Sequence, residues 1–329
     1  MDQHDINENQ REAEKRAPSS AWERETLEKV LLATLMEQRR ARRWGIFFKL
    51  LMLVYFGVAL WLVAQPFSEQ RSRSATSHTA VVDVAGMIAA GEKANADSII
   101  EGLRAAADAA GAKGIILRMN TPGGSPVQSA YVYEEIRRIK KLKPELPIYA
   151  VVADMCTSGG YYIASAADKI FVNQSSIVGS IGVIMDSFGF VEAINRLGIE
   201  RRVMTAGEHK AILDPFSPVD PVAKEHIQSV LNAIHKQFID AVRQGRGERL
   251  REDVSELYSG LVWTGAEGLK LGLVDGFGDV RYVAETVIGA KDIVNYTPEE
   301  SLWARLASRI GTAFGYMLRS AISVEPSLH

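Results

Sequence analysis

The hydrophobic pattern divides the chain into one long apolar segment near the N-terminus and a series of short apolar runs after it. From residue 79 onward, β-branched runs such as 79–88 and 114–120 alternate with segments of helical periodicity such as 96–112 and 129–143. Strands that are apolar along their whole length are typical of parallel sheets, and their alternation with helices is typical of βαβ units. We therefore predict an α/β domain whose parallel sheet is covered by helices on both faces.

Two later segments have a strong amphipathic pattern. Residues 222–242 place Ile227, Leu231 and Phe238 on one stripe, which predicts a long helix whose apolar side faces the core or a subunit interface. Residues 301–320 combine apolar positions with arginines. Such a segment can dock on a partner subunit or rest on an anionic membrane surface.

The long apolar segment, residues 44–64, contains Lys49 as its only charge. Since about 20 apolar residues cross the hydrocarbon core of a bilayer, it predicts one transmembrane helix. A cleaved signal peptide is the alternative, but the 43 preceding residues are long for its charged region and no small-residue cleavage site follows. Four arginines at 39–43 against Arg71 and Arg73 favour a cytoplasmic N-terminus.

These patterns define the expected organisation of the chain. A short amphipathic helix is expected before the membrane, where Ser20 and Glu23 have capping-box spacing. The expected parts are a cytoplasmic N-terminal segment (1–43), a transmembrane helix (44–64), a linker (65–78), a catalytic α/β domain (79–290) and a C-terminal amphipathic tail (291–329).

Composition and charge exclude several classes of protein. The 329 residues are 47% hydrophobic, enough for one large or two small cores. The single cysteine, Cys156, excludes an intrachain disulfide framework. A formal net charge of -2 argues against a dedicated nucleic-acid-binding protein.

Ser158 is the first candidate for chemistry, because it follows the apolar run 147–155 and opens a helical segment with two glycines. Ligands of open α/β sheets bind beyond the carboxyl ends of strands, and a helix N-terminus stabilises negative charge. The turn "NTPGG" adds backbone N–H groups, so Gly159 with Gly123 or Gly124 could form an oxyanion hole. A helix cap for Ser158 and an ordinary turn for "PGG" are the alternatives.

A nucleophilic serine needs a base, and the six histidines are poorly placed to provide one, with His209 the remaining possibility. No G-x-S-x-G, HExxH or CxxC motif is present, so neither a hydrolase elbow nor a zinc site is indicated. A lysine can act as the base when burial lowers its pKa. Spacing alone does not select which lysine.

Five motifs then occur in order between Val81 and Asp279: "NTPGG", "SGGYYIASAADKI", "IVGSIGVIM", "TAGEHKA" and "GLVWTGAEGLKLGLVDGFG". Together they resemble the bacterial signal peptide peptidase A family of membrane-bound serine peptidases. The resemblance implies an α/β fold similar to that of Clp protease and crotonase, a spiral of ββα units.

The same resemblance implies roles for individual residues. Ser158 would be the nucleophile and Lys210 the general base. Ser180 would orient the lysine, and the N–H groups of Gly124 and Gly159 would form the oxyanion hole. Neither a cofactor nor a metal is implied.

The implied function is that of a membrane-anchored serine endopeptidase that degrades remnant signal peptides and other membrane-released peptides. Relatives of the short, single-domain form assemble into rings, so the resemblance implies a homo-oligomeric ring, for which an octamer is one expected size. Ser158 and Lys210 could pair within or between subunits. The expected location is the bacterial inner membrane, with a cytoplasmic N-terminus and a periplasmic or extracellular catalytic domain. A crotonase-type acyl-CoA enzyme and a catalytically silent membrane scaffold are the alternatives.

Overall fold

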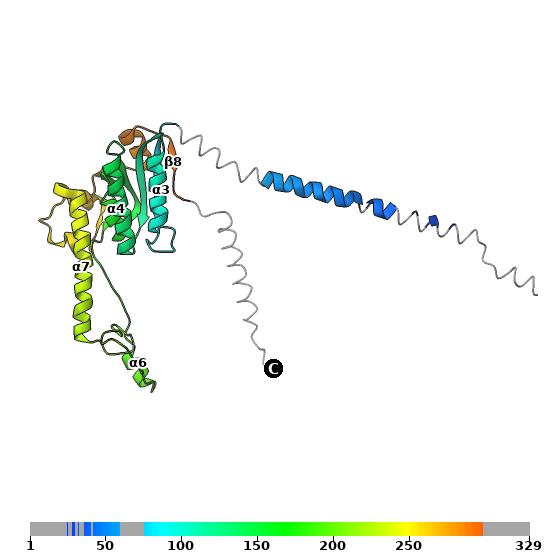
Figure 1. The fold of residues 1–329 in the computed structure, drawn as a ribbon. Helices are drawn as coiled ribbons and strands as arrows, with labels where there is room; N and C mark the ends of the chain where they lie inside the picture. The colour runs from blue at the N-terminus through cyan, green and yellow to red at the C-terminus, as the bar shows by residue number, and fades with distance from the viewer. Residues whose placement is uncertain are drawn as a thin grey trace, which may run out of the picture. The chain divides into compact units, whose positions relative to one another are not determined.

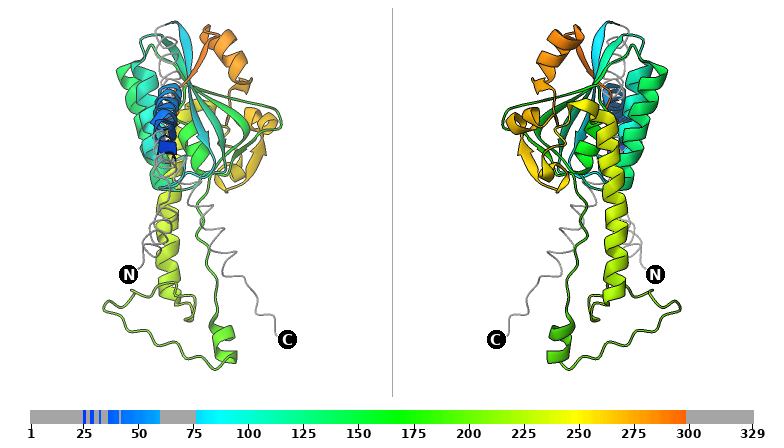
Figure 2. Two further views of the ribbon diagram at one scale, coloured as in Figure 1. Left: turned by 90° about the vertical axis from the view of Figure 1, so that its right-hand side faces the viewer. Right: turned by 90° about the vertical axis from the view of Figure 1, so that its left-hand side faces the viewer.

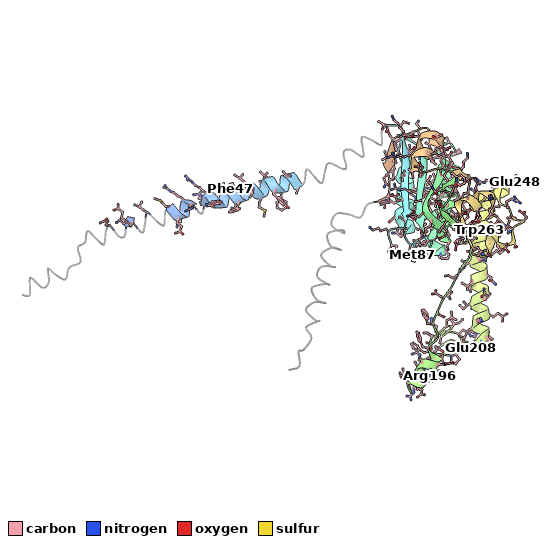
Figure 3. All side chains as sticks on the ribbon, turned by 180° about the vertical axis from the view of Figure 1, so that it is seen from behind. Phe47, Met87, Arg196, Glu208, Glu248 and Trp263 are labelled. Carbon is pink, nitrogen blue, oxygen red and sulfur yellow. The ribbon has the colours of Figure 1, made fainter. Side chains whose placement is uncertain are left out.

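The computed structural model describes residues 76–298 without a gap, and residues 25, 28–29, 32, 36–40 and 42–59 before them. The chain divides into two compact units, residues 1–70 and 71–329. In the first unit residues 42–59 are helical, and Phe47 is among their exposed apolar side chains (Figure 3). No helix within the described residues is long and apolar enough to cross a membrane.

Several sequence predictions fall outside these residues. The expected span 44–64 runs past residue 59, where the described part of that helix ends. The short helix expected before it is described at isolated positions only, and the C-terminal tail lies outside the described residues from 299 onward.

The second unit is a mixed α/β structure built on one sheet, which Figure 1 shows with its helices. The sheet has eight strands: six follow the order β6-β5-β3-β2-β1-β8, and off this path β4 pairs with β3 and β7 with β4. All strand pairs are parallel except β5 with β6. The strands are β1 (His78–Ala85), β2 (Ala112–Thr121), β3 (Ile148–Thr157), β4 (Lys169–Val172), β5 (Ile177–Gly179), β6 (Val262–Thr264), β7 (Gly276–Phe277) and β8 (Ile293–Asn295).

Helices connect these strands, and their bounds are close to the predicted ones. The helices are α3 (Ala96–Asp108), α4 (Pro126–Leu142), α5 (Gly159–Ala164), α6 (Val191–Arg196), α7 (Pro221–Arg246), α8 (Gly265–Lys270) and α9 (Val280–Tyr282). Short turns of other helix types are η1 (Gly247–Arg249), η2 (Ser255–Tyr258) and η3 (Val283–Ile288). Because β8 pairs with β1, the sheet extends past residue 290, the expected end of the domain.

Along its length, strand β3 pairs with two different strands. Its first half, Tyr149–Val151, pairs with β4, and its last residues, Met155–Thr157, pair with β5. This change of partner separates β4 from β5. It also brings β5, with the turn that follows it, beside the carboxyl end of β3. That end of β3 leads directly into Ser158.

The two faces of the sheet are covered unequally, which corrects the prediction of helices on both faces. Helices α3, α4, α5 and the last part of α7 share one large core with one face, as Figure 2 shows. On the other face a small cluster around Val283 and Ala284 covers only part of the strands. Beyond it the strands present polar side chains, such as Arg118 paired with Asp83 and Asn120 bonded to Asp154. The prediction assumed strands that are apolar along their whole length, and β1 and β2 carry polar side chains on this face instead.

Residues 182–220, which we call the extension, leave the sheet after β5 and return through α7. In Figures 1 and 2, α6 lies beyond the N-terminal end of α7, away from the sheet. Pro221 starts α7, and the Asp220 carboxylate accepts the N–H groups of Val222 and Ala223. Within α7 only the C-terminal part enters the core, where Phe238 stacks on Tyr162 at 4.9 Å between ring centroids. The predicted apolar stripe is thus buried at its C-terminal end, whereas Ile227 and Leu231 are half-buried.

Candidate active site

Ser158 stands between β3 and α5 in a conformation that a simple helix cap does not need. Its φ is 52° and its ψ is -126°, and its side chain makes no capping hydrogen bond. A positive φ is costly for a residue with a Cβ and persists only where the surroundings impose it. Here the Ser158 N–H donates to the Gly179 carbonyl at 2.8 Å, and the Ser158 carbonyl accepts the first helical bond from Tyr162. The backbone therefore turns sharply and leaves the hydroxyl uncommitted to the helix.

The turn predicted to face Ser158 lies directly against it. A Cβ built on Gly123 would come within 2.7 Å of both the Ser158 Cβ and the Gly159 nitrogen. The Thr157 hydroxyl donates to the Pro122 carbonyl at 3.1 Å and ties the two segments together. Since Gly123 has a φ of 99°, only glycine fits here without strain.

Two backbone N–H groups beside Ser158 are free. The Gly123 N–H is not one of them, because it donates to the Thr121 hydroxyl at 3.0 Å. Among the described residues neither Gly124 nor Gly159 has an acceptor for its N–H. A Cβ on Gly159 would lie 3.2 Å from the Gly124 nitrogen, so the two groups are neighbours. Paired free donors next to a serine are what a tetrahedral oxyanion requires.

Thr121 and Ser129 lie against the glycines of this site and were not singled out from the sequence. A Cβ on Gly159 would meet the buried Ser129 hydroxyl oxygen at 2.4 Å, and one on Gly160 would meet Thr121 Cγ2 at 2.5 Å. The threonine of "NTPGG" was a visible signal, because threonine hydroxyls often bond turn N–H groups. Ser129 carried no such signal, since it becomes relevant only when α4 packs against α5.

Ser180 lies close to Ser158 through the backbone. It follows Gly179, whose carbonyl accepts the Ser158 N–H, and its own N–H donates to the Leu261 carbonyl at 2.7 Å. Its φ is 53°, so two of the three non-glycine residues with positive φ in the described part are predicted site residues; the third is Leu213. The structure therefore brings together Ser158, Ser180 and the two glycines.

Lys210 is not brought to the same place within one chain. It lies in a turn of the extension, where its N–H donates to the Gly207 carbonyl at 3.1 Å, and it is exposed. In Figure 3 Glu208, two residues before Lys210, lies with Arg196 at the far end of the extension, whereas Trp263 marks strand β6 of the sheet. A lysine from this turn therefore reaches Ser158 of the same chain only if the extension moves.

Cys156 and His235 also lie near the site, and we assign neither of them a catalytic role. Cys156 is completely buried two residues before Ser158, and burial raises the pKa of its thiol, which makes it a small apolar side chain. His235 bonds the Ile181 carbonyl at 3.0 Å through Nε2, at the base of the extension. In the described part of the chain, no group of three or more His, Cys, Asp or Glu side chains could hold a metal.

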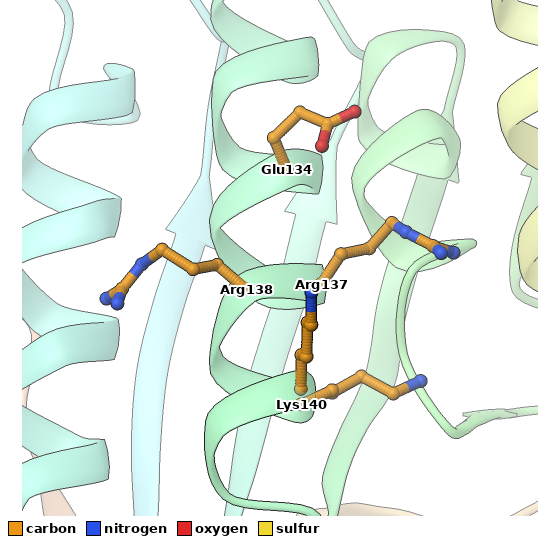
Figure 4. A pocket seen from close by; sticks show the side chains of 5 residues that line it. Glu134, Arg137, Arg138 and Lys140 are labelled. Carbon is orange, nitrogen blue, oxygen red and sulfur yellow. The ribbon is translucent and has the colours of Figure 1, made fainter.

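A groove of about 620 Å³ lies elsewhere, on the outer side of α4, where Glu134, Arg137, Arg138, Lys140 and Lys141 line it (Figure 4). Two of its cations already have partners, since Arg138 pairs with Glu135 and Lys140 with Asp168. The groove lies toward the end of α4 remote from the "PGG" turn that precedes this helix. We therefore do not assign the chemistry to it.

Comparison with known proteins gives one family and several relatives. Residues 140–293 match the model of peptidase family S49. Protease 4 of Haemophilus influenzae (strain ATCC 51907 / DSM 11121 / KW20 / Rd) is 33% identical over 220 residues, 66% of this chain and 35% of that protein. A protein of Enterococcus faecium that carries the name signal peptide peptidase SppA is 32% identical over 166 residues, 50% of this chain and 47% of that protein.

A protein of Brucella abortus (strain 2308) named Na(+)/H(+) antiporter NhaA is 40% identical over 217 residues. The match covers 66% of this chain but only 28% of that protein. The chain thus spans less than half of the length of each of these three relatives. Because most of the Brucella protein lies outside the match, its name assigns no transport activity to this chain.

Proposed function

Since the chain belongs to the signal peptide peptidase A family, we propose that it is a membrane-anchored serine endopeptidase that degrades remnant signal peptides and other membrane-released peptides. The observation that carries this proposal is the strained Ser158 beside two unpaired N–H groups, those of Gly124 and Gly159. The sheet and its helices fit a Clp protease and crotonase-like spiral of ββα units, which we include in the proposal.

The proposed chemistry is acyl transfer through a Ser-Lys dyad. The neutral amine of Lys210 takes the Ser158 proton while the serine oxygen attacks the scissile carbonyl carbon. The N–H groups of Gly124 and Gly159 donate to the resulting oxyanion. The peptide C–N bond then breaks, the lysine returns its proton to the leaving amine, and water hydrolyses the acyl-enzyme. Ser180 orients the lysine.

We assign the lysine to a neighbouring subunit of a homo-oligomeric ring. Lys210 is exposed and lies two residues after Glu208, which Figure 3 places at the far end of the extension from the sheet, and this position supports the arrangement. The extension also exposes large apolar side chains that a neighbouring copy would cover, including Ile184 at 89%, Met204 at 97% and Leu197 at 74%. We include in the proposal a ring for which an octamer is one expected size.

The membrane anchor and location belong to the proposal as well. The apolar run 44–64 would anchor the chain in the bacterial inner membrane, and the arginines before it would keep the N-terminus cytoplasmic. The peptidase domain would then be periplasmic or extracellular, where released signal peptides can reach it.

A serine-reactive fluorophosphonate tests the proposal most directly. We expect mass spectrometry to locate the label at Ser158, and we expect label and cleavage of a quenched apolar peptide to be lost in both Ser158→Ala and Lys210→Ala. An unlabelled, inactive wild type in a verified oligomer would contradict the peptidase function. A crotonase-type enzyme or a silent scaffold would then be examined by CoA binding and partner capture.

A further inference from the structure

Trp263 belongs to the motif "GLVWTG", to which the proposed mechanism gives no task. It lies on β6, opposite Val178 of β5, one residue before the strand ends. Among the described residues its Nε1 is the one buried side-chain nitrogen or oxygen without a hydrogen-bond partner. An unpaired buried donor is uncommon and calls for a reason other than hydrogen bonding.

The indole ring is packed against the backbone that holds the nucleophile. A Cβ built on Gly179 would come within 2.8 Å of Trp263 Cδ1 and 3.5 Å of its Nε1. Gly179 has a φ of 95° and Ser180, the next residue, a φ of 53°. The ring therefore lies directly behind the turn at which β5 ends.

This turn is bonded to Ser158. The Gly179 carbonyl accepts the Ser158 N–H at 2.8 Å, and the Ser180 N–H donates to the Leu261 carbonyl at 2.7 Å, on the segment that leads to Trp263. Contact thus runs without a break from the indole to Gly179 and from there to the strained serine. The costly φ of Ser158 needs such support from its surroundings.

We propose that Trp263 is a positioning residue for the nucleophile: its ring wedges the Gly179–Ser180 turn in place and so fixes the Ser158 backbone beside the oxyanion donors. The catalytic consequence rests on the proposed peptidase function, whereas the structural consequence does not. Because the shape of the ring is what matters, the indole N–H is dispensable, and its lack of a partner agrees with that.

The test compares Trp263→Ala, Trp263→Phe and a control, Leu103→Ala, in the full-length oligomer. Leu103 is fully buried on α3, so its truncation destabilises the domain by loss of packing alone. For Trp263→Ala we expect fluorophosphonate labelling of Ser158 to be slower by about tenfold or more, with a loss in kcat rather than a rise in KM. Trp263→Phe keeps a ring and should stay within about threefold of the wild type.

Hydrogen exchange of the Ser158 N–H provides a readout that needs no activity. We expect faster exchange in Trp263→Ala than in Leu103→Ala, measured at temperatures where both are folded. Equal exchange and equal labelling in these two variants would overturn the proposal, and so would a Trp263→Phe variant as impaired as Trp263→Ala. If the wild type is neither labelled nor active, the peptidase function fails, and the exchange comparison still decides the role of Trp263.

Discussion

At the scale of single residues, the site depends on missing side chains. A Cβ would collide with a neighbouring atom at Gly123, Gly124 and Gly159. The atom that it would meet is not of the same kind at each glycine. Gly123 and Gly124 also have positive φ, so larger residues there are strained whatever the space. Gly159 begins a helix with ordinary geometry, and the first atom its Cβ would meet is a side-chain oxygen, Ser129 Oγ.

This difference makes Gly159→Ala an informative substitution. The new Cβ would lie 2.4 Å from Ser129 Oγ and must push the Gly159 N–H away from that of Gly124, although the N–H itself remains. We expect peptide cleavage to fall by about a hundredfold, as for other small displacements of reacting groups.

Ser129→Ala is the matched control, because it removes the oxygen that the new Cβ would meet. Ser129→Ala deletes the hydroxyl, which donates only to the Ser125 carbonyl one helical turn earlier, and should retain most of the activity. The double variant should recover part of what Gly159→Ala loses, measured as kcat/KM. No recovery in a folded double variant would show that the collision with Ser129 Oγ does not cause the loss in Gly159→Ala.

At the scale of elements, α3 and α4 are joined by a charge cluster centred on Glu135. This carboxylate is 6% exposed and accepts hydrogen bonds from Arg104 on α3 and Arg138 on α4, at distances from 2.6 to 3.1 Å. Hydrogen bonds from Arg138 first, and then from Arg104, lower the pKa of Glu135 from 4.5 to about 2. Because α4 begins directly after the "PGG" turn, this cluster helps hold the helix that carries Ser129.

The lowered pKa makes a prediction about acid stability. A carboxyl group with a depressed folded-state pKa stabilises the fold above its unfolded pKa and loses that contribution as pH falls from about 4.5 to about 2. Glu135→Gln should therefore lower the free energy of unfolding by about 1–3 kcal/mol at pH 7, and the difference should be about half as large near pH 3, which lies between the two pKa values.

Urea denaturation of the detergent-solubilised chain at both pH values measures this difference. Glu134→Gln is the control, because Glu134 is exposed on the same helix. A Glu135→Gln effect that is equal at both pH values would contradict the assignment of the charge cluster as its cause.

At the scale of the whole molecule, the extension separates the two halves of the proposed dyad. Ser158 directly follows β3 of the sheet, whereas Lys210 lies in an exposed turn of the extension. A ring in which each extension reaches a neighbour would reunite them and bury its apolar side chains.

Mixing inactive variants distinguishes pairing between subunits from pairing within one. Ser158→Ala and Lys210→Ala subunits, co-expressed with different tags and purified through both, should regain about a quarter of wild-type cleavage if the dyad forms between randomly mixed subunits. Each variant alone is the control. No recovery in verified mixed rings would show that the dyad forms within one chain.

The sequence by itself determined the elements around the site. The carboxyl end of β3 and the glycines after Ser158 could be predicted, because hydrophobic periodicity and turn chemistry are local properties of the sequence. The motif order also identified the family, which the match of residues 140–293 supports.

Tertiary structure alone decided which groups are adjacent. Whether Gly123 or Gly124 keeps a free N–H depended on where the Thr121 hydroxyl points, and the contacts of Ser129 and Trp263 arise only when distant elements pack. The sequence likewise did not show that the sheet is covered unevenly or that Lys210 lies on an exposed turn of the extension. The physical reason is that local pattern specifies which face of an element is apolar, whereas packing of the whole chain specifies what that face meets.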